Sequence, residues 1–260
     1  MAPALAALRW DWPWMAPYAP YAQAVTAGLQ GGLSVAELLN QMAGALAPVR
    51  FVPEHQLPDG QAYEAHIAER RQCPTRDNLH DLFNGLTWLT FPRTKARLNF
   101  LQASEITRAG VGDRRGPLRD ALTLFDENGA LLQAPPALWQ ALEARNWQRL
   151  FVDLRGLWAQ ARLVLFGHAL QEKLQQPRKA ITAHVYRPQS ALALDLTLPQ
   201  WDEALAAELS AGHLAEKPYC PLPILGVPGW HLPNENVSFY DDAHVFRPPA
   251  TGRKSGALDN

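Results

Sequence analysis

The sequence predicts an α+β fold that is mainly helical, with a few short strands, in a single domain. Apolar residues recur at helical spacing in several segments, as in 78–89, where Leu79, Leu82, Phe83 and Leu86 fall on one face of a helix. Runs that favour strands are few and short. A chain of 260 residues can bury a full hydrophobic core, and no stretch has the composition of a clean linker.

The N-terminal part of the sequence predicts an aromatic arm followed by short elements. Residues 1–20 place three tryptophans among prolines, which indicates an irregular segment laid on the body of the protein through its aromatic rings. Ser34 is a good N-cap for a helix, with Glu37 at the spacing of a capping box. Helices are expected at 21–29, 35–46 and 61–70, and a short strand at 50–52.

The segment 74–99 predicts two consecutive helices with a high density of polar groups. Asp77 can cap the first helix and Pro92 ends it, with a second helix following. His80 and Asn84 are four residues apart, so they share the face opposite the apolar one. This density of polar groups indicates a functional site.

The remaining elements are assigned from turn signals and periodicity. A β-hairpin is expected near 121–133, because two apolar runs flank the turn-forming sequence Asp126-Glu127-Asn128-Gly129. Further helices are expected at 136–145, 147–175 and 201–209, and a strand at 180–186. Prolines indicate an irregular wrapping segment at 217–233. Residues 248–260 lack apolar content and predict a disordered tail, so the domain spans 1–247.

Charge, cysteine content and missing motifs exclude several classes of protein. The formal net charge is −1, so the chain as a whole is not a polyanion binder through its bulk field. Two distant cysteines match neither a zinc knuckle nor a secreted disulfide framework. No secretory signal is recognisable, and no stretch approaches the roughly 20 apolar residues of a membrane span. The glycine motifs of nucleotide-binding folds and the GxSxG elbow are missing. We therefore expect a cytoplasmic protein without membrane contact.

His168 and Glu172 are the first candidates for chemistry. They are four residues apart in a predicted helix and share one face. An imidazole and a carboxylate at this spacing can hold a divalent metal or act as an oriented base, and His184 on the next strand can supply a third group. The alternative is structural: Glu172 pairs with Lys173, Arg178 or Lys179, and His168 is a hydrogen-bonded core histidine.

Arg93, Lys95 and Arg97 are the second candidates. They surround a predicted helix start, where free backbone N–H groups and positive side chains favour an anion. Arginine adds a planar fork for phosphate or carboxylate. Residues 70–119 contain ten Lys or Arg against four Asp or Glu, a net charge of +6. The alternative is a solvated basic face or an internal set of ion pairs.

Long stretches of the chain are similar to a known family. They are PTRDNLHDLFNGLTWLTFPRTKARLN, GPLRDALTLFDENGALL, LFGHALQEKL with PRKAITAH, PLPILGVPGW and FYDDAHVFRP. From about Leu8 to Pro248 the chain resembles the proteobacterial domain-of-unknown-function family numbered 3025. The resemblance implies a discrete cytosolic bacterial domain and carries over no catalytic residue.

These observations give the hypothesis of one polar, anion-binding site. The site joins the 78–99 helix pair, the face of His168 and Glu172, and the 178–184 strand. The candidate catalytic residues are His80, His168 and Glu172. The candidate ligand-binding residues are Asn84, Arg93, Lys95, Arg97, Arg178, Lys179 and His184.

Hydrolysis of a phosphate ester or a related bond is the reaction that fits this hypothesis best. His80 or His168 would be the base, and the arginines would stabilise developing charge. The alternative is a non-catalytic interaction or nucleic-acid-binding protein that uses the basic 70–119 segment and exposed aromatic rings. Convergence of the candidate residues in one concave pocket would favour a site, whereas arginines spread over a convex face would favour binding.

Overall fold

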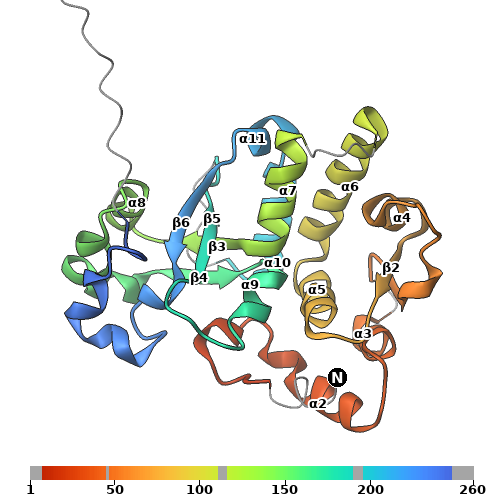
Figure 1. Ribbon diagram of the computed structural model, residues 1–260, viewed down its shortest axis with the longest axis horizontal. Coiled ribbons are helices and arrows are strands. Elements are labelled where there is room, and N and C mark those ends of the chain that lie inside the picture. Colours follow the sequence, from red (N-terminus) through yellow and green to blue (C-terminus); the bar gives the residue numbers. More distant parts are fainter. Residues whose placement is uncertain (1–7, 45–46, 111–115, 190–195, 248–260) are drawn as a thin grey trace, which may run out of the picture.

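The computed structural model describes residues 8–44, 47–110, 116–189 and 196–247. Within these ranges the strands are β1 (Arg50–Pro53), β2 (Gln72–Thr75), β3 (Gly129–Gln133), β4 (Arg162–Leu165), β5 (Thr182–Tyr186) and β6 (Tyr219–Pro223). The α-helices are α2 (Ala22–Gln30), α3 (Val35–Ala43), α4 (Tyr63–Arg70), α5 (Leu79–Thr90), α6 (Pro92–Ala109), α7 (Pro117–Asn128), α8 (Pro136–Glu143), α9 (His168–Lys173), α10 (Leu198–Glu208) and α11 (Ala211–Ala215). The fold is α+β and mainly helical, as expected (Figure 1).

A four-stranded mixed sheet with the order β4-β3-β5-β6 forms the centre of the molecule. Strand β3 runs antiparallel to β4, with Ala130 opposite Leu165, and parallel to β5, with Gly129 opposite His184. Because β3 begins where α7 ends and β4 ends just before α9, the end of α7 and the start of α9 meet at one edge of the sheet. The candidate site described below lies at this junction.

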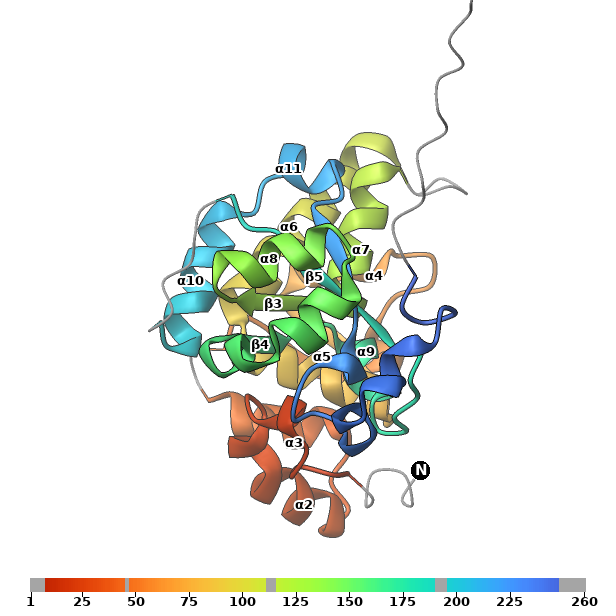
Figure 2. The same ribbon diagram turned by 90° about the vertical axis from the view of Figure 1, so that its left-hand side faces the viewer.

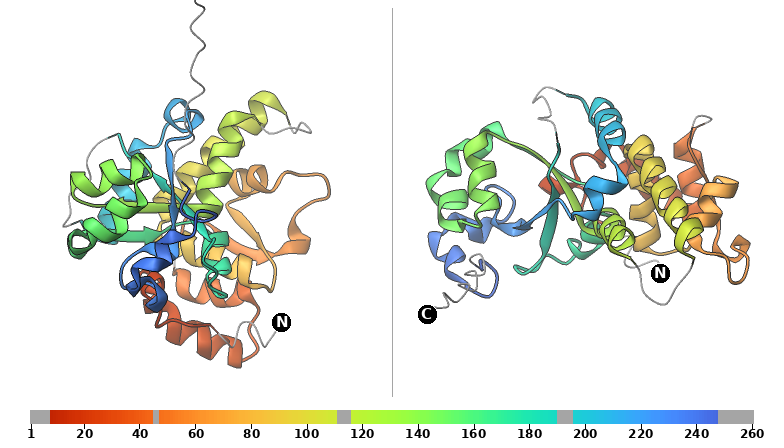
Figure 3. Two further views of the ribbon diagram at one scale, coloured as in Figure 1. Left: turned by 60° about the vertical axis from the view of Figure 1, so that its left-hand side comes forward. Right: turned by 90° about the horizontal axis from the view of Figure 1, so that it is seen from above.

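Helices cover the sheet on both faces. Helix α7 packs on β3 and β5, α6 packs on α7, and α4 packs on α6, so these helices follow one another outward from the sheet (Figures 1 and 3). Helix α8 packs against β6 on the other side, where Figure 2 shows it in front of β3 and β5. The site is therefore bounded by α4 to α7, and α8 lies away from it.

The N-terminal segment is anchored to the body of the protein by buried aromatic side chains. Trp14, Met15 and Tyr18 are buried in 3-10 turns, and the Tyr18 hydroxyl donates to the Leu165 carbonyl at 2.7 Å. Residues 8–20 are the described part of the expected aromatic arm. Residues 1–7 of the arm and the expected tail at 248–260 lie outside the described residues.

The helix starts follow local capping rules. Ser34 and Glu37 form the predicted capping box at the start of α3. The predicted cap of α5 is wrong by one residue: Asn78 caps it by accepting from Asp81 N, whereas Asp77 accepts from Val35 N and so ties α5 to α3. Both contacts satisfy backbone N–H groups that a helix start leaves without partners.

The hairpin expected near 121–133 is not formed. Residues 117–128 are helix α7, which begins at Pro117 and buries Ala121, Leu122 and Phe125 at helical spacing. The turn-forming residues Asp126 to Asn128 are the last helical turn, and β3 then pairs with β4 and β5. The apolar periodicity of 118–125 therefore prevails over the local turn signal.

The long helix expected at 147–175 is likewise several elements. It contains a π-helical turn at 149–153, a 3-10 turn at 155–160, strand β4 and helix α9. A continuous apolar run does not distinguish a buried strand from a buried helix, and that ambiguity explains the error. The segment 217–233, expected to be irregular, contributes β6, whose prolines are tolerated because β6 is an edge strand.

Among the described residues, no helix is both long enough and apolar enough to cross a bilayer.

Candidate functional site

Two histidines and a glutamate from distant parts of the chain form the centre of the site. Nδ1 of His80, in the first turn of α5, lies 2.9 Å from Oε2 of Glu172. Nε2 of the same ring lies 3.0 Å from Nε2 of His168, and the two rings meet edge to face. His168 and Glu172 share one face of α9, as the spacing predicts, but each contacts His80 rather than the other. The side chains of His80 and Glu172 are 35% and 40% exposed, whereas that of His168 is 7% exposed.

The far nitrogen of His168 faces a partly buried carboxylate. Nδ1 of His168 lies 3.5 Å from Oδ2 of Asp126 on α7. Burial lowers the pKa of His168 to about 4, because the attraction of Asp126 only partly offsets desolvation and the nearby charges of Lys95 and His80. His168 is therefore neutral near pH 7.

The contacts of the two imidazoles define how many protons they share. Nδ1 of His80 needs a hydrogen to donate to Glu172, and Nδ1 of His168 needs one to face Asp126 favourably. A third hydrogen is needed between the two Nε2 atoms. The two rings therefore form a proton-sharing pair with a carboxylate at each end.

A buried ion pair continues this network. Nζ of Lys95 donates to Oδ1 of Asp126 at 2.6 Å and to Oδ1 of Asn84 at 2.8 Å, and it lies 5.4 Å from the centre of the Trp88 ring. Burial alone would raise the pKa of Asp126, but the charges of Lys95 and His168 bring it below its ordinary value. Lys95 therefore holds Asp126 in its ionised form beside His168.

The network ends at a phenol and a thiol. The Asn84 amide donates to the Tyr63 hydroxyl at 3.2 Å, and that hydroxyl lies 3.2 Å from Sγ of Cys73. Burial raises the pKa of the Cys73 thiol to about 12 and holds the pKa of Tyr63 well above its ordinary value. Both groups are neutral near pH 7, so Cys73 is not a thiolate nucleophile.

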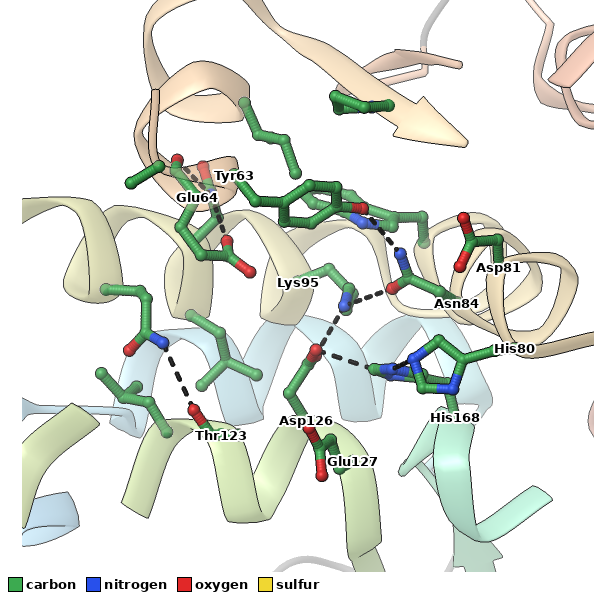
Figure 4. A pocket seen from close by; sticks show the side chains of 18 of the residues that line it. Tyr63, Glu64, His80, Asp81, Asn84, Lys95, Thr123, Asp126, Glu127 and His168 are labelled. Atoms are coloured by element: carbon green, nitrogen blue, oxygen red, sulfur yellow. Dashed lines mark hydrogen bonds and ion pairs between the residues drawn. The ribbon is translucent and has the colours of Figure 1, made fainter. Parts of the chain in front are cut away.

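These groups line a groove of about 480 Å³, within the size range of small-molecule sites. Its floor is formed by α6 and α7, which run antiparallel, because Lys95 contacts Asp126 near one end and Gln102 contacts Thr123 further along. Figure 4 shows Lys95 beside Asp126, with His80 and His168 at one end of the view and Thr123 towards the other.

Carboxyl groups on the wall and rim have their own partners. Asp81 accepts from the backbone N and the guanidinium of Arg76. Glu64 on α4 accepts from the Asn99 amide. Burial, reinforced by the charge of Asp126, raises the pKa of Glu64 above its ordinary value. The groove is therefore polar and densely hydrogen-bonded along its walls.

Two polar atoms in the far part of the groove have no hydrogen-bond partner. They are Nε of Arg119 on α7 and Oε1 of Gln102 on α6, and both are buried. A buried polar atom without a partner is costly, and a ligand can remove that cost.

The structure brings some of the predicted site residues together and separates others. His80, His168, Glu172, Asn84 and Lys95 belong to the network described above. The remaining five lie outside the groove, and they are Arg93, Arg97, Arg178, Lys179 and His184.

Contacts elsewhere explain most of this separation. Arg93 pairs with Glu203 at 2.7 Å and Arg97 donates to the Leu209 carbonyl, so both hold α6 against α10 and its end. Lys179 pairs with Asp242 and lies over the Phe239 ring. Arg178 is exposed and His184 lies in β5.

Four further residues belong to the site although no local motif in the sequence marks them, and they are Tyr63, Glu64, Arg119 and Asp126. The sequence Asp126-Glu127-Asn128-Gly129 predicts a turn, and this prediction conceals the helical position of Asp126. With residues 117–128 assigned as a helix, Arg119, Thr123 and Asp126 fall on one face, and this spacing would have indicated the groove.

The described part of the chain contains no cluster of three or more His, Cys, Asp and Glu side chains able to hold a metal ion. The divalent metal considered from the sequence therefore remains a prediction without a ligand set.

The sequence matches one known protein family. Residues 49–250 match the family model described as "Protein of unknown function (DUF3025)". The chain belongs to the DUF3025 family. No curated protein and no solved structure matches the chain.

The DUF3025 match contains every residue of the site. It begins just before β1 and includes α4 to α9, whereas the arm and helices α2 and α3 precede it. The imidazole pair, its carboxylates and the unpartnered Arg119 all lie in the region that defines the DUF3025 family.

Proposed function

We propose that this groove is the active site of a hydrolase that acts on a small anionic substrate, with a phosphate ester as the favoured class. The observation that supports it most is the pair of imidazoles 3.0 Å apart, each facing a carboxylate, at the edge of a polar groove. A histidine oriented by a carboxylate is a common general base and acid.

His80 is the proposed group that exchanges protons with the substrate. It is the more exposed of the two histidines. Glu172 binds its Nδ1 and its Nε2 lies 3.0 Å from Nε2 of His168, so in this proposal the substrate water replaces the His168 contact at Nε2. A water molecule gives a proton to this imidazole as its oxygen attacks phosphorus. The bond to the leaving oxygen then breaks, and that oxygen takes up the proton. His168 and Asp126 stabilise the imidazolium from the other side.

The buried Nε atom of Arg119 supports an anionic substrate. Arg76 in the same groove is bound to Asp81, and Lys95 is bound to Asp126, so both charges are largely balanced within the protein. Nε of Arg119 has no partner. A phosphate or carboxylate can supply one, because arginine binds such groups through paired N–H donors.

The alternative of nucleic-acid binding has less support. Arg76, Arg93, Lys95 and Arg108 are each engaged by an acidic side chain, so these charges of the basic 70–119 segment do not form an open face. We expect no salt-dependent retention of a single- or double-stranded oligonucleotide. Retention that is lost in an Arg93→Ala, Arg97→Ala double variant would favour the alternative.

A reducing, cytoplasmic location is part of the proposal, because Cys73 and Cys220 are both free thiols.

Turnover of simple phosphate monoesters and diesters by the purified protein tests the proposal. We expect His80→Asn to lower kcat on the order of a hundredfold, which is the usual contribution of a general acid or base. His244→Asn is the matched control, because His244 is exposed. The proposal is wrong if no ester is turned over, or if His80→Asn retains the rate of the wild type.

A further inference from the structure

The far part of the groove has features of a second binding position. Residues Arg119, Thr123 and Asp126 follow one face of α7, and Gln102 and Lys95 follow the facing side of α6. Arg119 is seven residues from Asp126, which places their backbones about 10 Å apart along the helix. The imidazole pair and Arg119 therefore lie at separate positions along the same groove.

The protein leaves this second position unsatisfied. Nε of Arg119 is buried without a partner. The pKa of Glu105 is lowered mainly by its hydrogen bond with Arg108 and to a smaller extent by the charge of Arg119. Both carboxylate oxygens of Glu105 are bound by Arg108, at 2.6 and 3.0 Å. The nearby carboxylate is thus already engaged.

Gln102 supplies a second unsatisfied polar atom on the facing helix. Its amide contacts the Thr123 hydroxyl through one end, and the other end has no hydrogen-bond partner. This is true whichever way the amide is turned, so Gln102 can either accept from or donate to a ligand. A guanidinium and an amide that face one groove form a site for a carboxylate or phosphate group with an adjoining polar atom.

We infer that Arg119, assisted by Gln102, binds a terminal anionic group of an elongated substrate whose reacting bond lies at His80 and His168, roughly 10 Å away. Arg119 is then a specificity-determining residue. The inference rests on the proposed function for the reacting end only, because binding at Arg119 does not require turnover. Apolar wall residues between the two positions, such as Leu98 and Leu122, suit a hydrocarbon spacer.

A series of ω-carboxyalkyl phosphonates with increasing spacer length tests the inference by calorimetry. These compounds resemble a phosphate ester but are not hydrolysed. We expect affinity to peak at one spacer length and to fall roughly ten- to a hundredfold in Arg119→Gln, the loss of one charge-assisted contact. The alkyl phosphonates without a carboxylate should bind the wild type and Arg119→Gln equally. A bisphosphonate series of the same lengths shows whether a second phosphonate replaces the carboxylate.

Control variants separate a lost contact from a disturbed fold. Arg149→Gln removes an exposed arginine from the π-helical turn and should leave all affinities unchanged. Arg119→Lys keeps the positive charge but loses the paired N–H donors of the guanidinium, so this variant should bind the carboxyalkyl phosphonates with intermediate affinity. Equal loss of affinity for the compounds with and without a carboxylate, or no dependence on spacer length, would overturn the inference.

Turnover of the matching ω-carboxyalkyl phosphates keeps the two proposals apart. Tight, spacer-dependent binding without turnover would support anion binding at Arg119 and contradict the proposed hydrolase activity. Turnover that is unchanged by loss of the substrate carboxylate and by Arg119→Gln would support the hydrolase activity and contradict anion binding at Arg119.

Discussion

Burial gives His168 an unusual role among the groups of the site. Its pKa of about 4 lies below the ordinary value of 6.5, so it resists protonation, whereas the side chain of His80 is 35% exposed at the edge of the groove. One imidazole is fixed in the core and the other is accessible, although the two are in direct contact.

The first prediction follows from this depressed pKa. Between about pH 6.5 and 4 the unfolded chain protonates His168 and the folded protein does not, so stability is lost as the pH falls through that window. The loss should be on the order of 2–3 kcal/mol. Urea unfolding at a series of pH values measures it, and the difference curve against His168→Asn isolates this residue. Parallel curves for the two proteins would contradict the assignment.

Glu172→Gln provides the second prediction. This change keeps the size of the side chain and weakens its hold on Nδ1 of His80. Because Glu172 is 40% exposed, the cost in stability should stay below about 1 kcal/mol. Turnover should fall on the order of tenfold or more, because the base is no longer oriented.

The matched control for this variant is Glu235→Gln, which removes an exposed acid paired with Arg155. It should leave turnover unchanged. A drop in melting temperature for Glu172→Gln, with full turnover, would show that the contact with His80 is structural.

At the scale of elements, the junction of α7, β3 and α9 positions the site. The Gly129 carbonyl accepts from both Phe166 N and Gly167 N, at 3.0 and 2.8 Å. Asp126 lies three residues before this carbonyl and His168 directly after Gly167. This shared carbonyl, together with the β3–β4 pairing, helps to fix the carboxylate and the imidazole relative to each other.

Gly167→Ala is the third prediction. An added Cβ would lie 2.5 Å from the backbone N of Asn128 and from the backbone O of Glu127, and neither atom can move freely. We expect a loss of about 1–3 kcal/mol in unfolding free energy, together with reduced turnover. Gly156→Ala is the control, since nothing lies within 4 Å of its Cβ. Similar stabilities for the two variants would show that the junction adapts.

Local sequence signals explain which elements could be predicted. Ser34 with Glu37 marks the start of α3 without ambiguity, and the apolar spacing of 79–86 identifies α5. Helix α7 could have been found from Pro117 and its apolar periodicity, but a turn-forming sequence occupies its last turn. Strand β4 could not have been predicted, because its short apolar run fits a helix equally well.

The site was predictable only in part for a related reason. The i,i+4 spacing of His168 and Glu172 shows that they share a face, but not that both contact His80, which lies 88 and 92 positions away. Arg93 and Arg97 face α10 and its C-terminal end because Glu203 and the Leu209 carbonyl lie there. Such long-range partners are set by packing, which residue spacing within one helix does not encode.

At the scale of the whole molecule, the folding unit extends beyond the region that defines the family. The match begins at residue 49, yet Tyr18 from the arm is fully buried beneath β4 and α9. Its hydroxyl donates to the Leu165 carbonyl and accepts from the Gln171 amide, two residues next to the site.

Tyr18→Phe is therefore the fourth prediction. The change leaves the Leu165 carbonyl and the Gln171 amide with fewer partners, and unfolding free energy should fall by about 1–3 kcal/mol. Tyr21→Phe is the comparison, because Tyr21 is only partly buried. Chemical denaturation measures both. A chain that begins at residue 47 and retains the stability of the full protein would contradict the view that the arm belongs to the domain.

The shared Gly129 carbonyl also bears on how this family can diverge. The imidazole end of the groove depends on this close contact between two chain segments, so an insertion between 126 and 129 or between 166 and 168 would separate Asp126 from His168. The Arg119 end lies two helical turns away from that constraint. Relatives can therefore exchange side chains at the Arg119 end and acquire new substrates while the imidazole pair stays in place. Diversity among relatives should concentrate at the start of α7 and along the second half of α6.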